Sequence, residues 1–452
     1  MALLDDNSRY RTVSLSPVPV EHTHADLDVD GAIPEELNGL YVRNGPNQMG
    51  PVSPTLHYFS GHGMVHGVRL RDGHAHWYRN RVVRAGDAAE VLGEDDRGGP
   101  VLNGIDFSPN TNVARFDDRL YATVEGGAAP VEIDPELETI ARSDLNGALT
   151  DGFSGHHKID PTAGDVHAVV YSMVLGQTAV YLRLNPHGQV TNRVEVPLSG
   201  FTQIHDMSIT ENYAVIYDLN VVFDPAMLER TTLPITWAPD KPARIGVLPK
   251  DGGTEDVRWF EVEPCYVYHP LNAYETGDGR LVLDVSRYER AARDDVFGPL
   301  GDTLPTIDRW TLDLNGTTSV ASAERVTDEP LDFPMVNPAY QGRPYRYGYT
   351  ARASLAPAFE GAVKIDHQTG TTTRQDFDGG NCGELTFVPR PNRTSEDDGW
   401  LMGFVYQPDR DRSRLVILDA QDFDGDPVAS IWIPDQRVPI GTHGDFLPAT
   451  DR

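Results

Sequence analysis

Four histidines stand in short segments with distinctive surroundings: His156 in SGHHKIDP, His205 in FTQIHDMSITENY, His269 in YVYHPLNAYE and His443 in PIGTHGDF. Structural zinc sites usually pair their ligands within about two to five residues, whereas the intervals here are 49, 64 and 174 residues. A site built from these histidines must be assembled by the tertiary structure. Four imidazoles without a thiolate suit iron, copper, nickel or zinc, and the spacing does not choose among them.

Three carboxylates are candidate partners of such imidazoles. Glu125 in LYATVEGG, Asp332 in EPLDFPMVN and Glu384 in NCGELTFVP are flanked by apolar or small residues, where an unpaired charge is costly. Metal-bound imidazoles usually donate their second ring N–H to a carboxylate, which fixes the tautomer and the direction of the ring. The alternative for each acid is a solvated position at the end of an exposed strand.

Composition excludes several classes of function. The chain has 68 acidic and 38 basic residues and a net charge of −30, so its surface repels nucleic acid and anionic lipid headgroups. Its two cysteines, Cys265 and Cys382, fit a reducing compartment. No apolar run approaches the roughly 18 residues that cross a bilayer, and no secretory signal pattern begins the chain, which predicts a cytoplasmic protein. Serine-hydrolase, phosphate-loop, HExxH and dinucleotide-binding motifs are absent.

The pattern of the chain is mostly β. Segments such as GVRLRDGHAHWYRNRVVR, ENYAVIYDLNVVF and EDDGWLMGFVYQ predict strands and hairpins separated by Asp and Gly turns, and convincing amphipathic helices are hard to find. No linker or low-complexity tract divides residues 1–452, so we expect a single domain. A propeller suits many hairpins without a break, and a pair of sandwiches is the alternative.

Long motifs in a fixed order resemble the carotenoid cleavage oxygenases, a family that includes apocarotenoid- and stilbene-cleaving enzymes and the animal retinoid isomerase. The resemblance runs through GAIPEELNGLYVRNGPN, HYFSGHGMVHGVRLRDGHAHWYRNRVVR, HKIDPTAGDVHAV, HDMSITENYAVI, FVPRPNRTSEDDGWLM and the terminal His-Gly. It implies an all-β fold, a seven-bladed β-propeller capped by loops and short helices. It also implies Fe(II) on the propeller axis, held by His156, His205, His269 and His443.

The resemblance also assigns residues around the iron. The family has His-Pro-Lys where this chain has His156-His157-Lys158, so counting back from Lys158 selects His156 as the ligand. The family has three glutamates that accept hydrogen bonds from the ligand imidazoles, and these correspond to Glu125, Glu384 and, as a departure, Asp332. The shorter aspartate implies a longer hydrogen bond, a bridging water or a shifted backbone. Thr111 in SPNTNV matches a position beside the iron that crowds one of its open sites.

The function implied is a non-heme Fe(II)-dependent dioxygenase that uses O2 to cleave a conjugated C=C bond of a carotenoid or apocarotenoid, giving two carbonyl products. The alternative is the same chemistry on stilbenes or phenylpropenes, whose cleaving enzymes resemble this chain but carry a lysine where it has Val124. A propeller that binds a ligand without catalysis is a third hypothesis. A hydrolytic zinc site is disfavoured, because four histidines saturate tetrahedral zinc.

An apolar substrate must be taken from a membrane or a carrier. In relatives the tunnel mouth carries an apolar patch, and the matching stretch DPAMLERTTLPITW suggests a lip made of Met227, Leu228, Leu233, Ile235 and Trp237. Such a lip predicts transient contact with a membrane surface, and ordinary packing against the propeller is the alternative. The sequence indicates neither the oligomeric state nor which double bond is cut.

Overall fold

The computed structural model describes residues 15–51, 53–292, 303–354, 359–434 and 437–449. These residues form a nearly all-β structure, which confirms the expected fold class. The helices among them are short: α1 (Ala88–Leu92) and the 3-10 turns η3 (Tyr58–Ser60), η4 (Pro225–Glu229), η5 (Thr254–Asp256) and η6 (Pro338–Tyr340).

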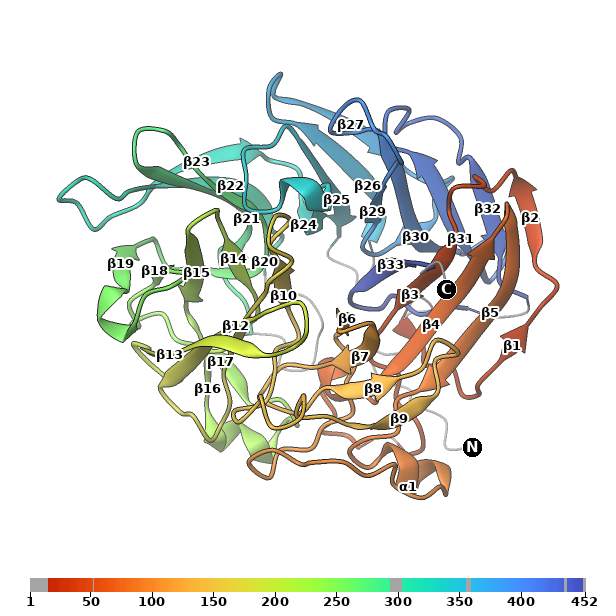
Figure 1. Ribbon diagram of the computed structural model, residues 1–452, viewed down its shortest axis with the longest axis horizontal. Coiled ribbons are helices and arrows are strands. Elements are labelled where there is room, and N and C mark those ends of the chain that lie inside the picture. The colour runs from red at the N-terminus through yellow and green to blue at the C-terminus, as the bar shows by residue number, and fades with distance from the viewer. Residues whose placement is uncertain (1–14, 52, 293–302, 355–358, 435–436, 450–452) are drawn as a thin grey trace.

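The sheets are arranged in a ring about a common centre and follow one another in chain order (Figure 1). The first sheet contains, in spatial order, β1 (Thr23–His24), β5 (His74–Val82), β4 (Met64–Arg71), β3 (Gly39–Arg43) and β33 (Gly444–Pro448). The next contains β6 (Asn112–Phe116), β7 (Arg119–Thr123), β8 (Val131–Ile133) and β9 (Thr139–Arg142). It is followed by β10 (His157–Ile159), β11 (Val166–Val170), β12 (Thr178–Leu184) and β13 (Val190–Pro197).

Two more four-stranded sheets continue the ring. One contains β14 (Met207–Ile209), β15 (Tyr213–Asp218), β18 (Arg244–Pro249) and β19 (Arg258–Glu261). The other contains β20 (Tyr266–Glu275), β21 (Arg280–Tyr288), β22 (Thr306–Asp313) and β23 (Ser322–Thr327). A small pair is formed by β16 (Val221–Phe223) and β17 (Ile235–Trp237).

The remaining strands belong to one ten-stranded sheet. Its path runs through β2 (Asp28–Gly31), β32 (Ala429–Trp432), β31 (Arg412–Asp419), β30 (Gly399–Gln407), β28 (Asn381–Cys382), β26 (Phe359–Asp366), β25 (Tyr347–Ala353) and β24 (Leu331–Met335). Two strands lie off that path, β27 (Thr371–Gln375) on β26 and β29 (Thr386–Pro389) on β30. Because this sheet is larger than a single blade, the sheet count alone does not give the expected number of seven.

The local sequence explains why hairpins form. In the hairpin of β4 and β5, Arg71 pairs with His74 across a two-residue turn made by Asp72 and Gly73. Both turn residues have positive φ angles, 50° and 72°, the conformation that Asp-Gly adopts readily and that matches the twist of the strands. Strand β13 alternates exposed and buried residues, whereas β11, inside its sheet, is buried throughout.

The hydrophobic core lies between neighbouring sheets. One cluster joins Val169 and Tyr181 to Ile209 and Ile216, which belong to successive sheets of the ring. Another packs Phe116 against Val166 and Leu182 in the same way. Each sheet therefore buries both faces against its neighbours, which leaves the innermost strands to surround the centre.

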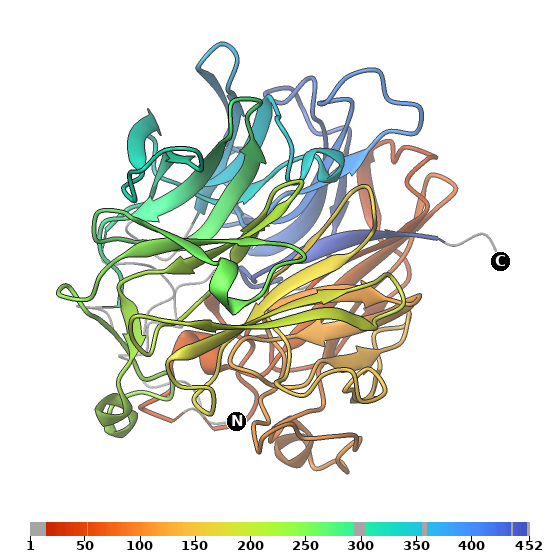
Figure 2. The same ribbon diagram turned by 60° about the vertical axis from the view of Figure 1, so that its left-hand side comes forward.

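The innermost strands contact one another around that centre. Strand β10 contacts β14, β14 contacts β20 and β20 contacts β24, while β33 contacts both β29 and β6. The ring is closed by segments from opposite ends of the chain (Figure 2), because β33 pairs with β3 and β32 pairs with β2. This closure protects strand edges that an open array would expose.

Candidate metal centre

Innermost strands deliver all four histidines to the centre of the ring. His156 directly precedes β10, His205 lies just before β14, His269 is part of β20, and His443 directly precedes β33. Because these are the first strands of their sheets, or in the case of β33 the strand that closes the ring, residues up to 287 positions apart are brought to one place. The sequence predicted that a site built from these histidines would be assembled from distant segments, and the four imidazoles are brought together in this way.

The four imidazoles converge on a buried point. One ring nitrogen from each lies within 4.8 Å of the others. The Nε2 atoms of His156 and His205 are 3.1 Å apart, and those of His205 and His269 are 3.3 Å apart. The ring of His443 lies edge-on to that of His156, with a centroid separation of 4.3 Å.

The three acids named from the sequence all lie behind these rings. His205 Nδ1 is 2.6 Å from Glu125 Oε1, His269 Nδ1 is 2.8 Å from Asp332 Oδ1, and His443 Nδ1 is 2.6 Å from Glu384 Oε2. Since a carboxylate accepts, each Nδ1 carries the proton and each Nε2 presents a lone pair to the centre. The aspartate reaches its imidazole directly, in spite of its shorter side chain.

Burial and charge act in opposite directions at these pairs. Burial by itself raises the pKa of Glu125, but the charge and hydrogen bond of His205, with hydrogen bonds from Tyr171 and Gln203, hold it below its usual value. The pKa of Asp332 is also held below its usual value. Burial raises it, but His269, Tyr288 and the Phe333 N–H together lower it by more. Burial, followed by the three neighbouring histidines, lowers the pKa of His156 well below its usual value, which keeps this imidazole neutral.

His156 differs from the other three in its outer partner. Its Nδ1 lies 3.5 Å from Asp206 Oδ2, which also accepts a hydrogen bond of 2.8 Å from Lys158 Nζ. The adjacent His157 points elsewhere, with its ring near those of Phe116 and Phe153. The structure thus brings His156, and not His157, into the cluster. Sequence reasoning did not single out Asp206, although it is adjacent to His205.

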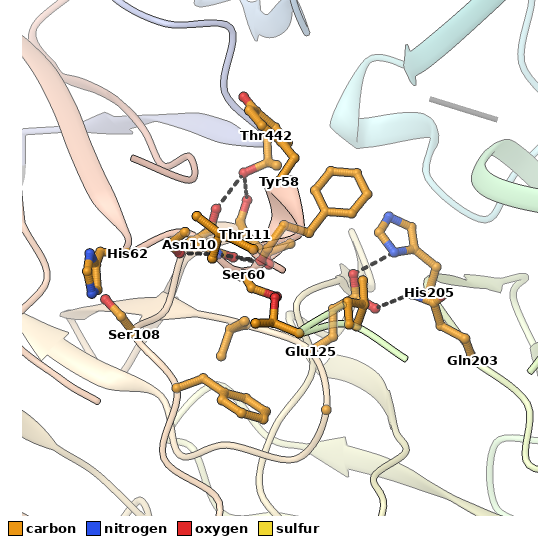
Figure 3. A pocket seen from close by; sticks show the side chains of 18 of the residues that line it. Tyr58, Ser60, His62, Ser108, Asn110, Thr111, Glu125, Gln203, His205 and Thr442 are labelled. Atoms are coloured by element: carbon orange, nitrogen blue, oxygen red, sulfur yellow. Dashed lines mark hydrogen bonds and ion pairs between the residues drawn. The ribbon is translucent and has the colours of Figure 1, made fainter. Parts of the chain in front are cut away.

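Thr111 contacts the backbone of His443 and lines the same cavity as three of the histidines. Its carbonyl accepts the backbone N–H of His443 at 3.0 Å and also the hydroxyl of Thr442. Its own hydroxyl donates to Asn110 Oδ1 at 3.2 Å (Figure 3). A Cβ atom at Gly155 would come 2.8 Å from the Thr111 methyl and 3.0 Å from Glu125 Cγ. Glycine before His156 therefore allows both side chains to pack against the backbone there.

A cavity of about 610 Å³ opens onto three of the histidines, His205, His269 and His443. Figure 3 shows part of it, with Glu125 and His205 on one side and Asn110 and Thr111 nearby. Much of its wall is apolar and aromatic, including Phe107, Val124, Met173, Phe223, Leu228, Leu233, Phe333 and Phe359. Its described lining contains neither lysine nor arginine, so the wall offers no cationic side chain to an anionic ligand.

The donor set fits a divalent first-row metal ion. Two imidazoles bound to one ion at about 2.1 Å hold their nitrogens roughly 3.0 to 3.4 Å apart at octahedral or tetrahedral angles. The nearest Nε2 pairs, at 3.1 and 3.3 Å, have this separation. Four lone pairs directed at one buried point repel one another unless a cation lies between them.

Comparisons with known proteins agree with this fold. Residues 15–448 match the family model described as retinal pigment epithelial membrane protein. A carotenoid cleavage oxygenase of Mycobacterium tuberculosis is 40% identical, over 96% of this chain and 97% of the relative. Cobalt-substituted Synechocystis apocarotenoid oxygenase superposes with a TM-score of 0.85 at 30% identity, covering 96% of this chain and 97% of that one. Pseudomonas brassicacearum lignostilbene dioxygenase gives a TM-score of 0.87 at 25% identity, covering 99% and 100%.

The fold and the relatives define an oxidoreductase of the dioxygenase class, as the sequence predicted. The chain belongs to the retinal pigment epithelial membrane protein family, the family of the carotenoid cleavage oxygenases. The resemblance read from its motifs is confirmed.

We expect Glu384→Ala to weaken metal binding by about 10- to 100-fold, since it removes the acceptor that holds the His443 ring. Metal content after gel filtration through a weak chelator measures the effect. Glu360→Ala is the control, because that glutamate side chain is 56% exposed and pairs with Arg352. Equal metal retention in both variants would contradict the role of Glu384.

Proposed function

We propose that the protein is a non-heme Fe(II)-dependent dioxygenase that cleaves a conjugated C=C bond of a carotenoid or apocarotenoid with O2, yielding two aldehydes. The observation that carries the proposal is a cluster of four buried imidazoles, three of which line a largely apolar cavity. The names of relatives, carotenoid cleavage oxygenase and apocarotenoid oxygenase, support the substrate class. One O2 supplies both carbonyl oxygens, so the reaction balances without another reductant.

His156, His205, His269 and His443 are the proposed ligands. Their neutral imidazoles favour the ferrous state, and bound ferrous iron would supply the binding and activation of O2. Glu125, Asp332 and Glu384 fix three of the rings through Nδ1 and contribute negative charge that strengthens their donor character. Thr111 is proposed to restrict the space beside the cluster, so that substrate and O2 occupy defined positions.

The cavity wall would bind the substrate and exclude water. Apolar and aromatic side chains replace water around the conjugated chain and hold one double bond beside the imidazoles. Exclusion of water also protects reactive species from side reactions. The partly buried side chain of Val124 lines this cavity next to Glu125, and it offers no charge to a phenolate.

Cleavage of stilbenes or phenylpropenes is the second candidate function. The likeness to a lignostilbene dioxygenase along the whole chain favours it. Stilbene-cleaving enzymes that resemble this chain carry a lysine where it has Val124. This difference argues for a carotenoid or apocarotenoid substrate. We therefore rank apocarotenoids and carotenoids first.

The complete architecture is proposed to be a seven-bladed propeller in one domain, residues 1–452, with the metal on its axis. Strands β26 and β28 are joined in the ten-stranded sheet by a single residue pair, Glu360 with Asn381. Dividing the sheet there separates β24–β27 from the strands around β30 and brings the ring to seven blades. An experimental density map would count them.

The lip of the cavity differs from the one expected. Leu228 is 50% exposed and lines the cavity, and Leu233 lines it while partly buried. Ile235 was wrongly included, because it is buried in a core cluster against which Trp237 packs. Phe107 and Met173, 51% and 49% exposed, line the cavity as well. The sequence did not indicate them.

We propose that Phe107, Met173 and Leu228 touch a membrane surface transiently while substrate enters. No helix among the described residues has the length and apolar character to span a bilayer. The charge of −30 favours neutral over anionic lipid headgroups. The cytoplasmic location stays a prediction.

Purified protein should retain ferrous iron close to one equivalent, and His205→Ala should lower the iron content and abolish cleavage, because one of four ligands is lost. Elemental analysis and product mass spectrometry under 18O2 measure both effects. Protein without iron, or a variant with unchanged turnover, would overturn the proposed chemistry.

Turnover of an apocarotenal should exceed that of a hydroxystilbene, since no cation in the described cavity wall binds a phenolate. Val124→Lys should shift the ratio of kcat/KM values towards the stilbene by about tenfold or more. Chromatographic product analysis under anaerobic iron loading followed by O2 addition compares the two. Faster stilbene cleavage by the unmodified protein would reverse our ranking.

The double substitution Met173→Ser with Leu228→Ser should slow cleavage of substrate presented in phosphatidylcholine vesicles several-fold and leave micellar substrate unaffected. Val320→Ser is the control, because Val320 is 57% exposed and lies outside the cavity lining. If the double variant cleaved vesicle-bound substrate as fast as the unmodified protein does, membrane contact by these residues would be refuted.

A further inference from the structure

Asp332 lies in β24 with its carboxylate fully engaged. Oδ1 accepts hydrogen bonds of 2.8 Å from His269 Nδ1 and 2.8 Å from the Phe333 backbone N–H. Oδ2 accepts a hydrogen bond of 2.5 Å from the Tyr288 hydroxyl. Because Asp332 borders the cavity, a carboxylate without these partners could rotate towards it and away from His269.

The backbone next to Asp332 departs from regular strand geometry. The pairing of β24 with β25 is irregular between Asp332 and Met335. Phe333, inside that irregularity, has a φ of 49°, in the left-handed region that residues with a side chain seldom adopt.

Interactions around Phe333 offset this unfavourable conformation. Its N–H is the donor to Asp332 Oδ1 already described, and its ring stacks on His269 at a centroid distance of 5.0 Å and an angle of 26°. The same ring packs edge-on against Phe359 at 5.0 Å. The left-handed residue thus supports both members of the pair, Asp332 and His269.

Tyr288 approaches the carboxylate from a different sheet. It is the last residue of β21 and is 1% exposed. Its ring packs edge-on against Tyr268 at 5.3 Å, and Tyr268 packs edge-on against His205 at 5.0 Å. These contacts leave the phenol little freedom, so its hydroxyl acts as a fixed donor.

We propose that Tyr288 is a positioning residue: its hydroxyl fixes the outer oxygen of Asp332 and so holds the other oxygen against His269. The inference rests on the proposed metal site and adds a group to it. The same device recurs at Glu125, whose Oε2 accepts the Tyr171 hydroxyl. At Glu384 the backbone N–H of Gly444 lies 3.3 Å from the second oxygen instead.

The test is release of ferrous ion, loaded anaerobically, into an excess of a chromogenic ferrous chelator. Tyr288→Phe should release iron about tenfold faster, because Asp332 loses the donor that fixes its outer oxygen. In the cobalt-loaded protein the visible d–d absorption bands should shift, since the His269 ring is free to reorient.

A matched control separates this effect from a loss of stability. The Tyr345 hydroxyl also donates at 2.5 Å to a buried aspartate, Asp284, and Tyr345 does not line the cavity beside the histidines. Tyr345→Phe should leave the iron release rate and the cobalt spectrum unchanged, whatever its effect on thermal stability. Equal changes of release rate in the two variants would overturn the proposal.

A double-mutant cycle shows whether Tyr288 acts through Asp332. Asp332→Ala should speed iron release, and adding Tyr288→Phe to it should have no further effect. Fully additive effects would overturn the proposal while leaving the metal site intact. If the unmodified protein and His269→Ala both bind no iron, the metal site and this inference fail together.

Discussion

The structure depends on one electrostatic constraint, the convergence of four imidazole lone pairs on a single buried point. Each ring must present Nε2 and not Nδ1, so Nδ1 needs a fixed acceptor behind it. Three carboxylates supply this at His205, His269 and His443, and burying them is tolerable because each accepts hydrogen bonds from protein groups. A ring of sheets satisfies the constraint, since its first strands can each bring one residue to the centre.

Much of this centre could be predicted from the sequence. The four histidines and three acids lie in motifs whose order the family shares, and an acid such as Glu384 between Gly383 and Leu385 is expensive without a partner. The choice of His156 over His157 also followed from the position of Lys158. Asp-Gly turns and alternating strands gave the all-β class, because these signals are local.

The remaining features depend on contacts between distant segments and have no local signal. Nothing near Tyr288 indicates that its hydroxyl meets Asp332, and nothing near Phe333 indicates its left-handed backbone or the stacking of its ring on His269. The lip illustrates the same limit. Phe107 and Met173 come from loops far from Leu228 in sequence, while Ile235, adjacent in sequence, turns into the core. Exposure is decided by the whole fold.

The pairing of β3 with β33 has a consequence for the order of events during synthesis. His443 precedes β33, and this strand finds its partner β3 almost the whole described chain away. A nascent chain can form its early hairpins on the ribosome, yet it lacks the fourth imidazole until the final strand emerges. The complete set of four imidazoles therefore exists only after ring closure, and a chain stalled before residue 443 would present three histidines and an open sheet edge to the cell.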